Sequence, residues 1–333
     1  MSHAHRPNLD DFFVVTVISN PVRYKRRYEL YERFARMCLA AGVKLITVEQ
    51  AFGDRDHLIT KRDNPFHLQI RSVEELWHKE NMIDMGVAHG RKLFPRATKI
   101  AWVDADCAPA REPRDWFEET WHELQHYEFV QMWESMIDLD HYFQPIGGAQ
   151  PGFMANYIKY GTPNPEEFKE IEASYGGSKI FGRPGLAWAA NIDAYDKVGG
   201  LIDFAILGAG DWYMAHGLIG SMKVPTGEMC SSAYERKLLD WQEKAERWIK
   251  RDVGYVRGMV YHYFHGRKKN RFYGTRGKIL IENKFDPNTD IKYDSHGMLQ
   301  LETWEPRQLK LRDQIRGYFR ARDEDCIYNG DGR

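Results

Sequence analysis

Short apolar strand patterns alternate with longer helical patterns over the first hundred residues, and this alternation constrains the fold more than any other feature. The run DFFVVTVIS (11–19) is rich in β-branched residues and almost continuously apolar, which predicts a strand buried on both faces. A helix is expected within 20–42, where Asn20 can cap, Pro21 suits the first turn and Gly42 suits the end. A strand followed by a returning helix is typical of a parallel sheet covered by helices.

The same order then repeats along the chain. VKLITVEQ (43–50) predicts a second strand, and a long helix is expected over 72–94, where Ser72 and Glu75 have the spacing of a capping box. TKIAWVDAD (98–106) predicts a third strand. We therefore expect an α/β fold with a mostly parallel sheet flanked by helices, in which ligands bind beyond the carboxyl ends of the strands.

Polar side chains fall at or near the ends of all three predicted strands: Ser19 and Asn20, Glu49 and Gln50, Asp104 and Asp106. In an extended chain, residues two apart lie on the same side, so the two aspartates repel each other unless a cation lies between them. Hard carboxylate oxygens are suitable ligands for Mg²⁺ or Mn²⁺. The phosphates of a substrate commonly complete the coordination shell of such an ion. The alternative interpretation is that Asp104 and Asp106 lie at the start of a loop, where they cap backbone groups or face solvent.

The remainder of the chain is less regular. The Gly- and Pro-rich stretch 147–168 predicts a surface loop, the alternating charges of 233–250 predict a solvated helix, and 307–326 predicts a final helix. We expect two halves of one domain, 11–110 and 111–285, followed by a C-terminal extension, 286–333.

Composition excludes some classes of function. Lys+Arg 47 against Asp+Glu 48 leave a net charge of -1, so no global field attracts nucleic acid or anionic lipid. No apolar run reaches the roughly 18 residues of a membrane span, and the first residues lack the order of a secretory signal. Four dispersed cysteines fit reduced thiols rather than a disulfide frame: Cys38, Cys107, Cys230 and Cys326. We expect a cytoplasmic protein of unspecified oligomeric state.

The segment WVDAD resembles the D-x-D motif of nucleotide-sugar-dependent glycosyltransferases of the GT-A fold, where the motif follows a central strand. The resemblance implies that Asp104 and Asp106 bind Mn²⁺ or Mg²⁺ against the diphosphate of a nucleoside-diphosphate sugar, with a UDP-sugar favoured. Asp104 is also expected to contact the ribose. KENMIDMGVAHG is similar to the preceding helix of the family, so Lys79 and Asn81 are expected to face the donor.

Two later segments extend the resemblance. GAGDWYM is similar to the glycine-then-acid segment beside the acceptor, which implies that Asp211 is the general base of an inverting enzyme; its plain alternative is a helix cap. HYFHG resembles a late segment that supplies a histidine metal ligand. In an extended chain His262 and His265 point to opposite sides, so we expect only one of them to bind the metal.

Three segments together, PGLAWA, GAGDWYMAHGLIG and HYFHGRKKNRFYGTRGKIL, resemble a group of glycosyltransferase-like proteins of bacteriophages and bacteria, over roughly residues 11 to 287. Many relatives are expected to have a histidine at the position of Trp212. This difference places the role of the Asp211 segment in question. Within the basic and aromatic stretch 255–278, some bases, for which we take Arg267 and Arg271, are expected to clamp the donor diphosphate, and others to steer a polyanionic acceptor. A solvated charged surface is the alternative for that stretch.

The expected function is therefore transfer of a sugar to an acceptor hydroxyl. Ser19, Asn20 and Glu49 would recognise the base and ribose, and Asp211 would accept the hydroxyl proton. The acceptor proposed from the phage resemblance is a 5-hydroxymethylpyrimidine in DNA; a polysaccharide, glycolipid or protein acceptor is the alternative. A sugar nucleotidyltransferase is a rival class, although SNPVRYKRRY lacks the glycines of its phosphate loop. A carbohydrate-binding protein without catalysis is the other rival.

Overall fold

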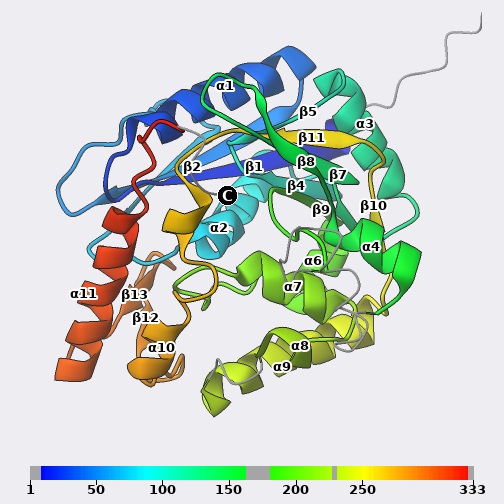
Figure 1. The fold of residues 1–333 in the computed structure, drawn as a ribbon. Coiled ribbons are helices and arrows are strands. Elements are labelled where there is room, and N and C mark those ends of the chain that lie inside the picture. Colours follow the sequence, from blue (N-terminus) through cyan, green and yellow to red (C-terminus); the bar gives the residue numbers. More distant parts are fainter. Residues whose placement is uncertain (1–8, 163–180, 227–230, 329–333) are drawn as a thin grey trace, which may run out of the picture.

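The computed structural model describes residues 9–162, 181–226 and 231–328 (Figure 1). Its centre is a seven-stranded sheet in the order β10-β6-β9-β4-β1-β2-β3. Every neighbouring pair is parallel except those that β9 forms with β4 and β6, so the expected mostly parallel α/β sheet is confirmed. The strands are β1 (Phe12–Ser19), β2 (Lys44–Phe52), β3 (His67–Ser72), β4 (Lys99–Val103), β6 (Phe129–Gln131), β9 (Ala187–Asn191) and β10 (Val253–Tyr255).

Strand β1 is buried on both faces, as its apolar run predicts. Phe13 and Val15 belong to one hydrophobic cluster, and Phe12 and Val14 belong to a second. Because successive side chains of a strand point to opposite faces, the two clusters lie on opposite sides of the sheet. The sheet is therefore the middle layer between two hydrophobic cores.

Helices cover the central sheet and extend below it in the view of Figure 1. α2 packs on β1 and β2, and α1 packs on β2 and α3. The helices are α1 (Lys25–Ala41), α2 (Lys79–Leu93), α3 (Pro113–Glu123), α4 (Phe153–Tyr160), α6 (Ile192–Val198), α7 (Gly210–Leu218), α8 (Lys223–Thr226), α9 (Ser232–Trp248), α10 (Lys278–Glu282) and α11 (Pro306–Ala321), with 3-10 turns at Leu9–Asp11 and Lys268–Arg271. None of the helices in the described part of the chain is long and apolar enough to cross a membrane.

A second sheet brings distant segments to the end of β4. Its order is β5-β11-β7-β8, formed by β5 (Cys107–Pro109), β7 (Ser135–Leu139), β8 (Pro145–Pro151) and β11 (Met259–His262). His262 pairs in register with Cys107 on one side and Asp138 on the other. The chain passes from the first sheet to the second through residues 104–106, so the D-x-D turn lies beside the end of β11. A separate hairpin joins β12 (Ile291–Tyr293) to β13 (Leu299–Leu301).

Two predicted helix starts are wrong, and local hydrogen bonds explain both. Asn20 does not cap α1, because its amide exchanges hydrogen bonds with the backbone of Tyr24 and closes a turn before the helix begins at Lys25. Ser72 ends β3 and its hydroxyl bonds to the backbone of Glu74, so no capping box forms and α2 begins at Lys79. The predicted end at Gly42 is confirmed, with φ at 69°.

Other expectations divide between confirmed and wrong. The helices expected in 233–250 and 307–326 are confirmed as α9 and α11. The loop expected over 147–168 is wrong where it is described, because β8 and α4 occupy most of it; 163–168 lie outside the described residues. Strand β3 had no clear signal in the sequence. The expected boundaries at 110 and 285 stay predictions.

Candidate active site and metal centre

A cavity of about 720 Å³ lies at the carboxyl ends of β1 and β4. Its size falls in the range of sites that enclose a small molecule or cofactor. Its walls come from the end of β1, the first turns of α1, the start of α2, the turn after β4, β7, the segment before β9, the start of α7, and the chain from β11 to the end of α11. Eight predicted site residues line it: Ser19, Lys79, Asp104, Asp106, Asp211, His262, His265 and Arg271.

Asp106, His262 and His265 form a cluster able to hold a metal ion. One ligand atom of each lies within 4.8 Å of the others, and Nε2 of His265 is 3.2 Å from Oδ2 of Asp106. Nδ1 of His262 lies 2.7 Å from Oδ1 of Asp138. A carboxylate behind a histidine fixes the ring and leaves its other nitrogen free to bind a metal.

The chemistry of this cluster fits a divalent cation. Oδ1 of Asp106 is buried and has no hydrogen-bond partner in the described part of the chain. Burial, together with the Arg271 guanidinium, lowers the pKa of His265 to about 3, so the imidazole is neutral at physiological pH. Nδ1 of His265 is 3.1 Å from the carbonyl oxygen of Tyr263 and 3.2 Å from Arg271 Nη2. Donation from Nδ1 to that carbonyl leaves Nε2 as a lone-pair ligand.

The expectation that the two histidines point to opposite sides is wrong. Their ring centroids are 5.2 Å apart, and both rings face Asp106. Strand β11 ends at His262, and residues 263–265 belong to no helix or strand. The strict alternation of side chains in a strand therefore need not continue to His265.

The two aspartates of the D-x-D motif have different partners. Strand β4 ends at Val103, so Asp104 and Asp106 belong to a turn and do not share one face of a strand as expected. The Asp104 carboxylate lies 2.6 and 2.8 Å from Nζ of Lys79. Burial alone would lower the pKa of Lys79, but the carboxylates of Asp104 and Asp211 outweigh it and raise that pKa. Metal binding by Asp104 stays a prediction.

Asp211 lies in the first turn of α7 and faces the cavity. The chain reaches it through Gly208 and Ala209, both at positive φ, and Ala209 is the N-cap. Oδ1 of Asp211 accepts a hydrogen bond from the amide of Trp212 at 2.8 Å. Oδ2 lies against Gly185, where a Cβ atom would approach it to 2.6 Å. Asp211 therefore bonds to its own helix start and lies open to the cavity at the same time.

The other four predicted donor contacts do not line the cavity, because their side chains bind backbone groups elsewhere. Glu49 accepts from the amides of residues 58–60, and Asn20 bonds to Tyr24. Asn81 bonds to Gly297 and Leu299 near β13. Arg267 donates to the carbonyl oxygen of Ile327. Their expected donor roles stay predictions.

Several cavity residues had not been predicted, above all on the C-terminal side. The Trp77 indole stacks on Phe319 of α11, with an angle of 9° between the rings, and Arg322 lies 5.3 Å from its ring centroid. Arg276 and Arg322 both donate to the Tyr318 hydroxyl. The basic run 267–278 marks Arg276 in the sequence, but no pattern marks the other residues as parts of a site: Arg27, Trp77, Glu80, Arg183 and Arg322.

No protein-family model matches the sequence, and no curated protein matches it. Among solved structures, the chain is similar to a glycosyltransferase involved in the glycosylation of the major capsid of PBCV-1, with a TM-score of 0.32, 8% identity, and coverage of 81% of this chain and 98% of that one. It is also similar to a putative glucose-1-phosphate thymidylyltransferase from Bacillus anthracis in complex with a sucrose, with a TM-score of 0.33, 8% identity, and coverage of 86% and 98%. Scores this low carry no functional assignment.

Proposed function

We propose that this protein is a metal-dependent glycosyltransferase, which moves a sugar from a nucleoside-diphosphate sugar to an acceptor hydroxyl. The observation that carries the proposal is the meeting of the Asp106, His262 and His265 cluster with Asp211 in one cavity of about 720 Å³. A binding protein without catalysis needs neither a buried metal cluster nor a carboxylate base. Metal ligands, a basic wall and a carboxylate together favour group transfer.

Arginines on the cavity wall support a diphosphate-containing donor. Arg271 donates to the Tyr273 hydroxyl and lies 3.2 Å from Nδ1 of the neutral His265, and Arg276 donates to the Tyr318 hydroxyl. Neither arginine is bonded to a carboxylate in the described part of the chain. Guanidinium groups bind phosphate oxygens in a forked geometry. We therefore assign these two arginines to the diphosphate, with a UDP-sugar as the first donor to test.

The cation we favour is Mn²⁺. Mg²⁺ prefers oxygen ligands and retains its water, whereas the cluster offers two imidazole nitrogens and one carboxylate. Asp106, His262 and His265 would hold the ion. When bound, the ion neutralises negative charge on the diphosphate as the leaving group departs.

Asp211 performs the proton transfer in this proposal. Its carboxylate accepts the proton of the acceptor hydroxyl while the oxygen attacks the anomeric carbon of the sugar. The new carbon–oxygen bond forms as the bond to the diphosphate breaks, and that electron pair leaves on the nucleoside diphosphate. Attack from the face opposite the leaving group inverts the anomeric centre.

The acceptor we propose is a 5-hydroxymethylpyrimidine in DNA. The supporting features are exposed basic and aromatic side chains in the stretch 269–278, of which Tyr273 lines the cavity, namely Lys269, Phe272, Tyr273 and Lys278. The inward bases of the same stretch do not contribute to such a surface, because Lys268 pairs with Asp138 and Arg271 is buried. A saccharide, glycolipid or protein hydroxyl is the alternative acceptor.

Donor hydrolysis tests the reaction class. The protein is incubated with Mn²⁺ and a panel of UDP-, GDP- and CDP-sugars, and we expect free nucleoside diphosphate from one of them. Release of pyrophosphate from a nucleoside triphosphate and a sugar 1-phosphate, supplied in a parallel reaction, would identify a nucleotidyltransferase instead. Tight sugar binding without turnover would identify a binding protein.

Mass spectrometry of nucleosides tests the acceptor. Hydroxymethylated DNA is treated with the protein and the active donor, then digested, and we expect a hydroxymethylpyrimidine heavier by one sugar residue. Unmodified DNA is the matched control. Unchanged nucleoside masses with the active donor would exclude the DNA acceptor and leave the reaction class untouched.

A further inference from the structure

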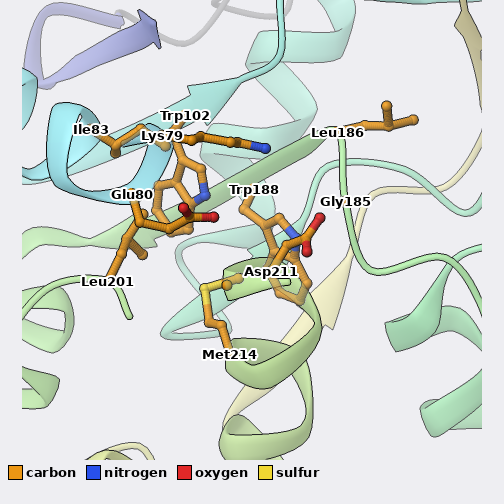
Figure 2. A pocket seen from close by; sticks show the side chains of 11 residues that line it. Lys79, Glu80, Ile83, Trp102, Gly185, Leu186, Trp188, Leu201, Asp211 and Met214 are labelled. Atoms are coloured by element: carbon orange, nitrogen blue, oxygen red, sulfur yellow. The ribbon is translucent and has the colours of Figure 1, made fainter. Parts of the chain in front are cut away.

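A second, much smaller cavity lies beside Asp211 and has room for one water molecule. Its volume is about 10 Å³, close to the minimum that holds a single water. Figure 2 shows its lining, in which Lys79, Glu80 and Asp211 are the charged side chains and Trp102 and Trp188 contribute large apolar surfaces. Three ionisable side chains around a space of this size provide the hydrogen-bond partners that a buried water requires.

Glu80, which lines this cavity, has no role in the proposed transfer reaction. The residue is 4% exposed, and its Oε2 is buried with no hydrogen-bond partner in the part of the chain that is described. A buried carboxyl oxygen without a partner costs free energy, so its retention at the edge of an active site needs an explanation.

Two glycines make room for Glu80 and Asp211. A Cβ atom on Gly210 would lie 2.5 Å from Cδ and Oε1 of Glu80, and one on Gly185 would lie 2.6 Å from Oδ2 of Asp211. Neither glycine needs positive φ, so close packing of the acids is what restricts these two positions. Gly210 directly precedes Asp211, and Glu80 therefore packs against the backbone that carries the base.

We propose that Glu80 is a positioning residue for Asp211, and that the two carboxyl groups hold one water molecule between them in the small cavity. In this arrangement Glu80 donates through the water to one Asp211 oxygen, and the other oxygen is left for the acceptor hydroxyl. The inference rests on the proposed role of Asp211 as the base.

The charges around Glu80 support a protonated carboxyl group. The charged groups that face it are Lys79 on its own helix, Asp211 on α7 and Asp104 after β4. Burial raises the pKa of Glu80 to about 8; Lys79 opposes this effect, and the two aspartates add to it. A neutral carboxyl group can donate a hydrogen bond to a water beside Asp211, whereas an ionised one cannot.

Three variants test the inference on transfer rate. Glu80→Gln keeps a donor of the same shape, and we expect kcat within about threefold of wild type below pH 7. Glu80→Leu removes the donor, and we expect kcat to fall at least tenfold with KM for the donor sugar nearly unchanged. Gly210→Ala, whose Cβ displaces the Glu80 carboxyl group, should reproduce that loss if the leucine variant fails to fold. Full activity of Glu80→Leu or Gly210→Ala would overturn the proposal.

The pH profile separates positioning from a purely structural role. Wild-type kcat should fall on the alkaline side with a midpoint near pH 8, as Glu80 loses its proton, and Glu80→Gln should lack this fall. Asp84→Asn is the matched control, because burial also raises the pKa of Asp84 to about 8 but Asp84 bonds to Tyr195 and Leu201 instead. An alkaline fall that persists in Glu80→Gln would contradict the inference.

Two measurements stay informative if no sugar transfer is found. A raised pKa in the folded state means that wild type loses stability as pH rises from about 4.5 to 8, so Glu80→Gln should gain thermal stability over wild type across that interval. A high-resolution crystal structure should contain one ordered water within hydrogen-bond distance of both carboxyl groups. Absence of that water would defeat the inference. Absence of transfer with the water present would defeat the proposed function and leave only the water-linked pair of carboxyl groups established.

Discussion

One histidine of the metal cluster is oriented by a carboxylate that is not itself a proposed ligand. His262 is fixed by Asp138, and Asp138 also accepts from Gln150 and Lys268. Burial alone would raise the pKa of Asp138, but His262 and Lys268 outweigh it and hold that pKa well below its usual value. Asp138 therefore remains a carboxylate at the pH of any ordinary assay.

Removal of that carboxylate should weaken the metal site. We expect Asp138→Asn to lower Mn²⁺ affinity by about 10- to 100-fold, since the ring of His262 loses its charged partner. Calorimetry of Mn²⁺ binding to the folded variant provides the measurement. Asp140→Asn is the matched control, because Oδ1 of Asp140 accepts from backbone amides of its own turn and an amide oxygen preserves these bonds. An equal loss of Mn²⁺ affinity in both variants would contradict a specific role of Asp138 in the metal site.

Asp211→Asn should separate catalysis from binding. The amide cannot accept the acceptor proton, so we expect kcat to fall by about 10²- to 10⁴-fold while Mn²⁺ affinity stays within twofold of wild type. Steady-state kinetics and calorimetry on the same preparation provide the comparison. A variant that keeps its rate would show that another group takes the proton.

At the scale of elements, the C-terminal segment holds the first helix in place. The Asp325 carboxylate accepts from the amides of Lys25 and Arg26, and so caps α1 from 300 residues away. Glu324 is 1% exposed and pairs with Arg27 and Arg322, both of which line the cavity. The segment that follows α11 therefore shapes the wall of the site as well as the fold.

Loss of the Glu324 charge should destabilise the protein. Glu324→Gln leaves two guanidinium groups without their partner, and we expect a loss of about 3 kcal/mol in the free energy of unfolding at pH 7. Denaturant unfolding provides the measurement, with Asp323→Asn as the control because asparagine tolerates the positive φ of 46° at that position.

The pH dependence of this effect has a definite sign. Burial alone would raise the pKa of Glu324, but Arg27 and Arg322 hold it well below the ordinary value of 4.5. The stabilisation is therefore present above pH 4.5 and is lost as pH falls further. The difference between wild type and Glu324→Gln should shrink in acid; a constant difference would show that the charge is not its origin.

For the whole molecule, metal binding should increase the free energy of unfolding. The metal cluster joins the turn after β4 to the end of β11 and the chain beyond it, so an ion bound there favours the folded state. At a free Mn²⁺ concentration of 100 times Kd we expect a gain of about 2.7 kcal/mol. Thermal unfolding with and without Mn²⁺ measures it, and Asp106→Asn should abolish the gain. An unchanged gain in that variant would place the ion elsewhere.

The sequence predicted the central architecture and the general location of the site. The apolar run of β1, the glycine after α1 and the acids after β4 are local signals, and each survives in the structure. The pairing of His262 and His265 was not predictable from spacing, because an extended chain was assumed where β11 in fact ends. Glu80 and Arg322 carried no signal, since nothing nearby in the chain distinguishes them from ordinary helix residues.

By itself, the sequence determined which segments are buried and where acids follow a strand, because the periodicity of apolar residues records burial over a few positions. Only the tertiary structure decided which polar groups meet. Asp106 joins two histidines more than 150 residues away because β11 lies between β5 and β7, and Arg322 reaches the cavity because the chain after α11 returns to the start of α1. Such meetings depend on packing across the whole fold, which no local pattern encodes.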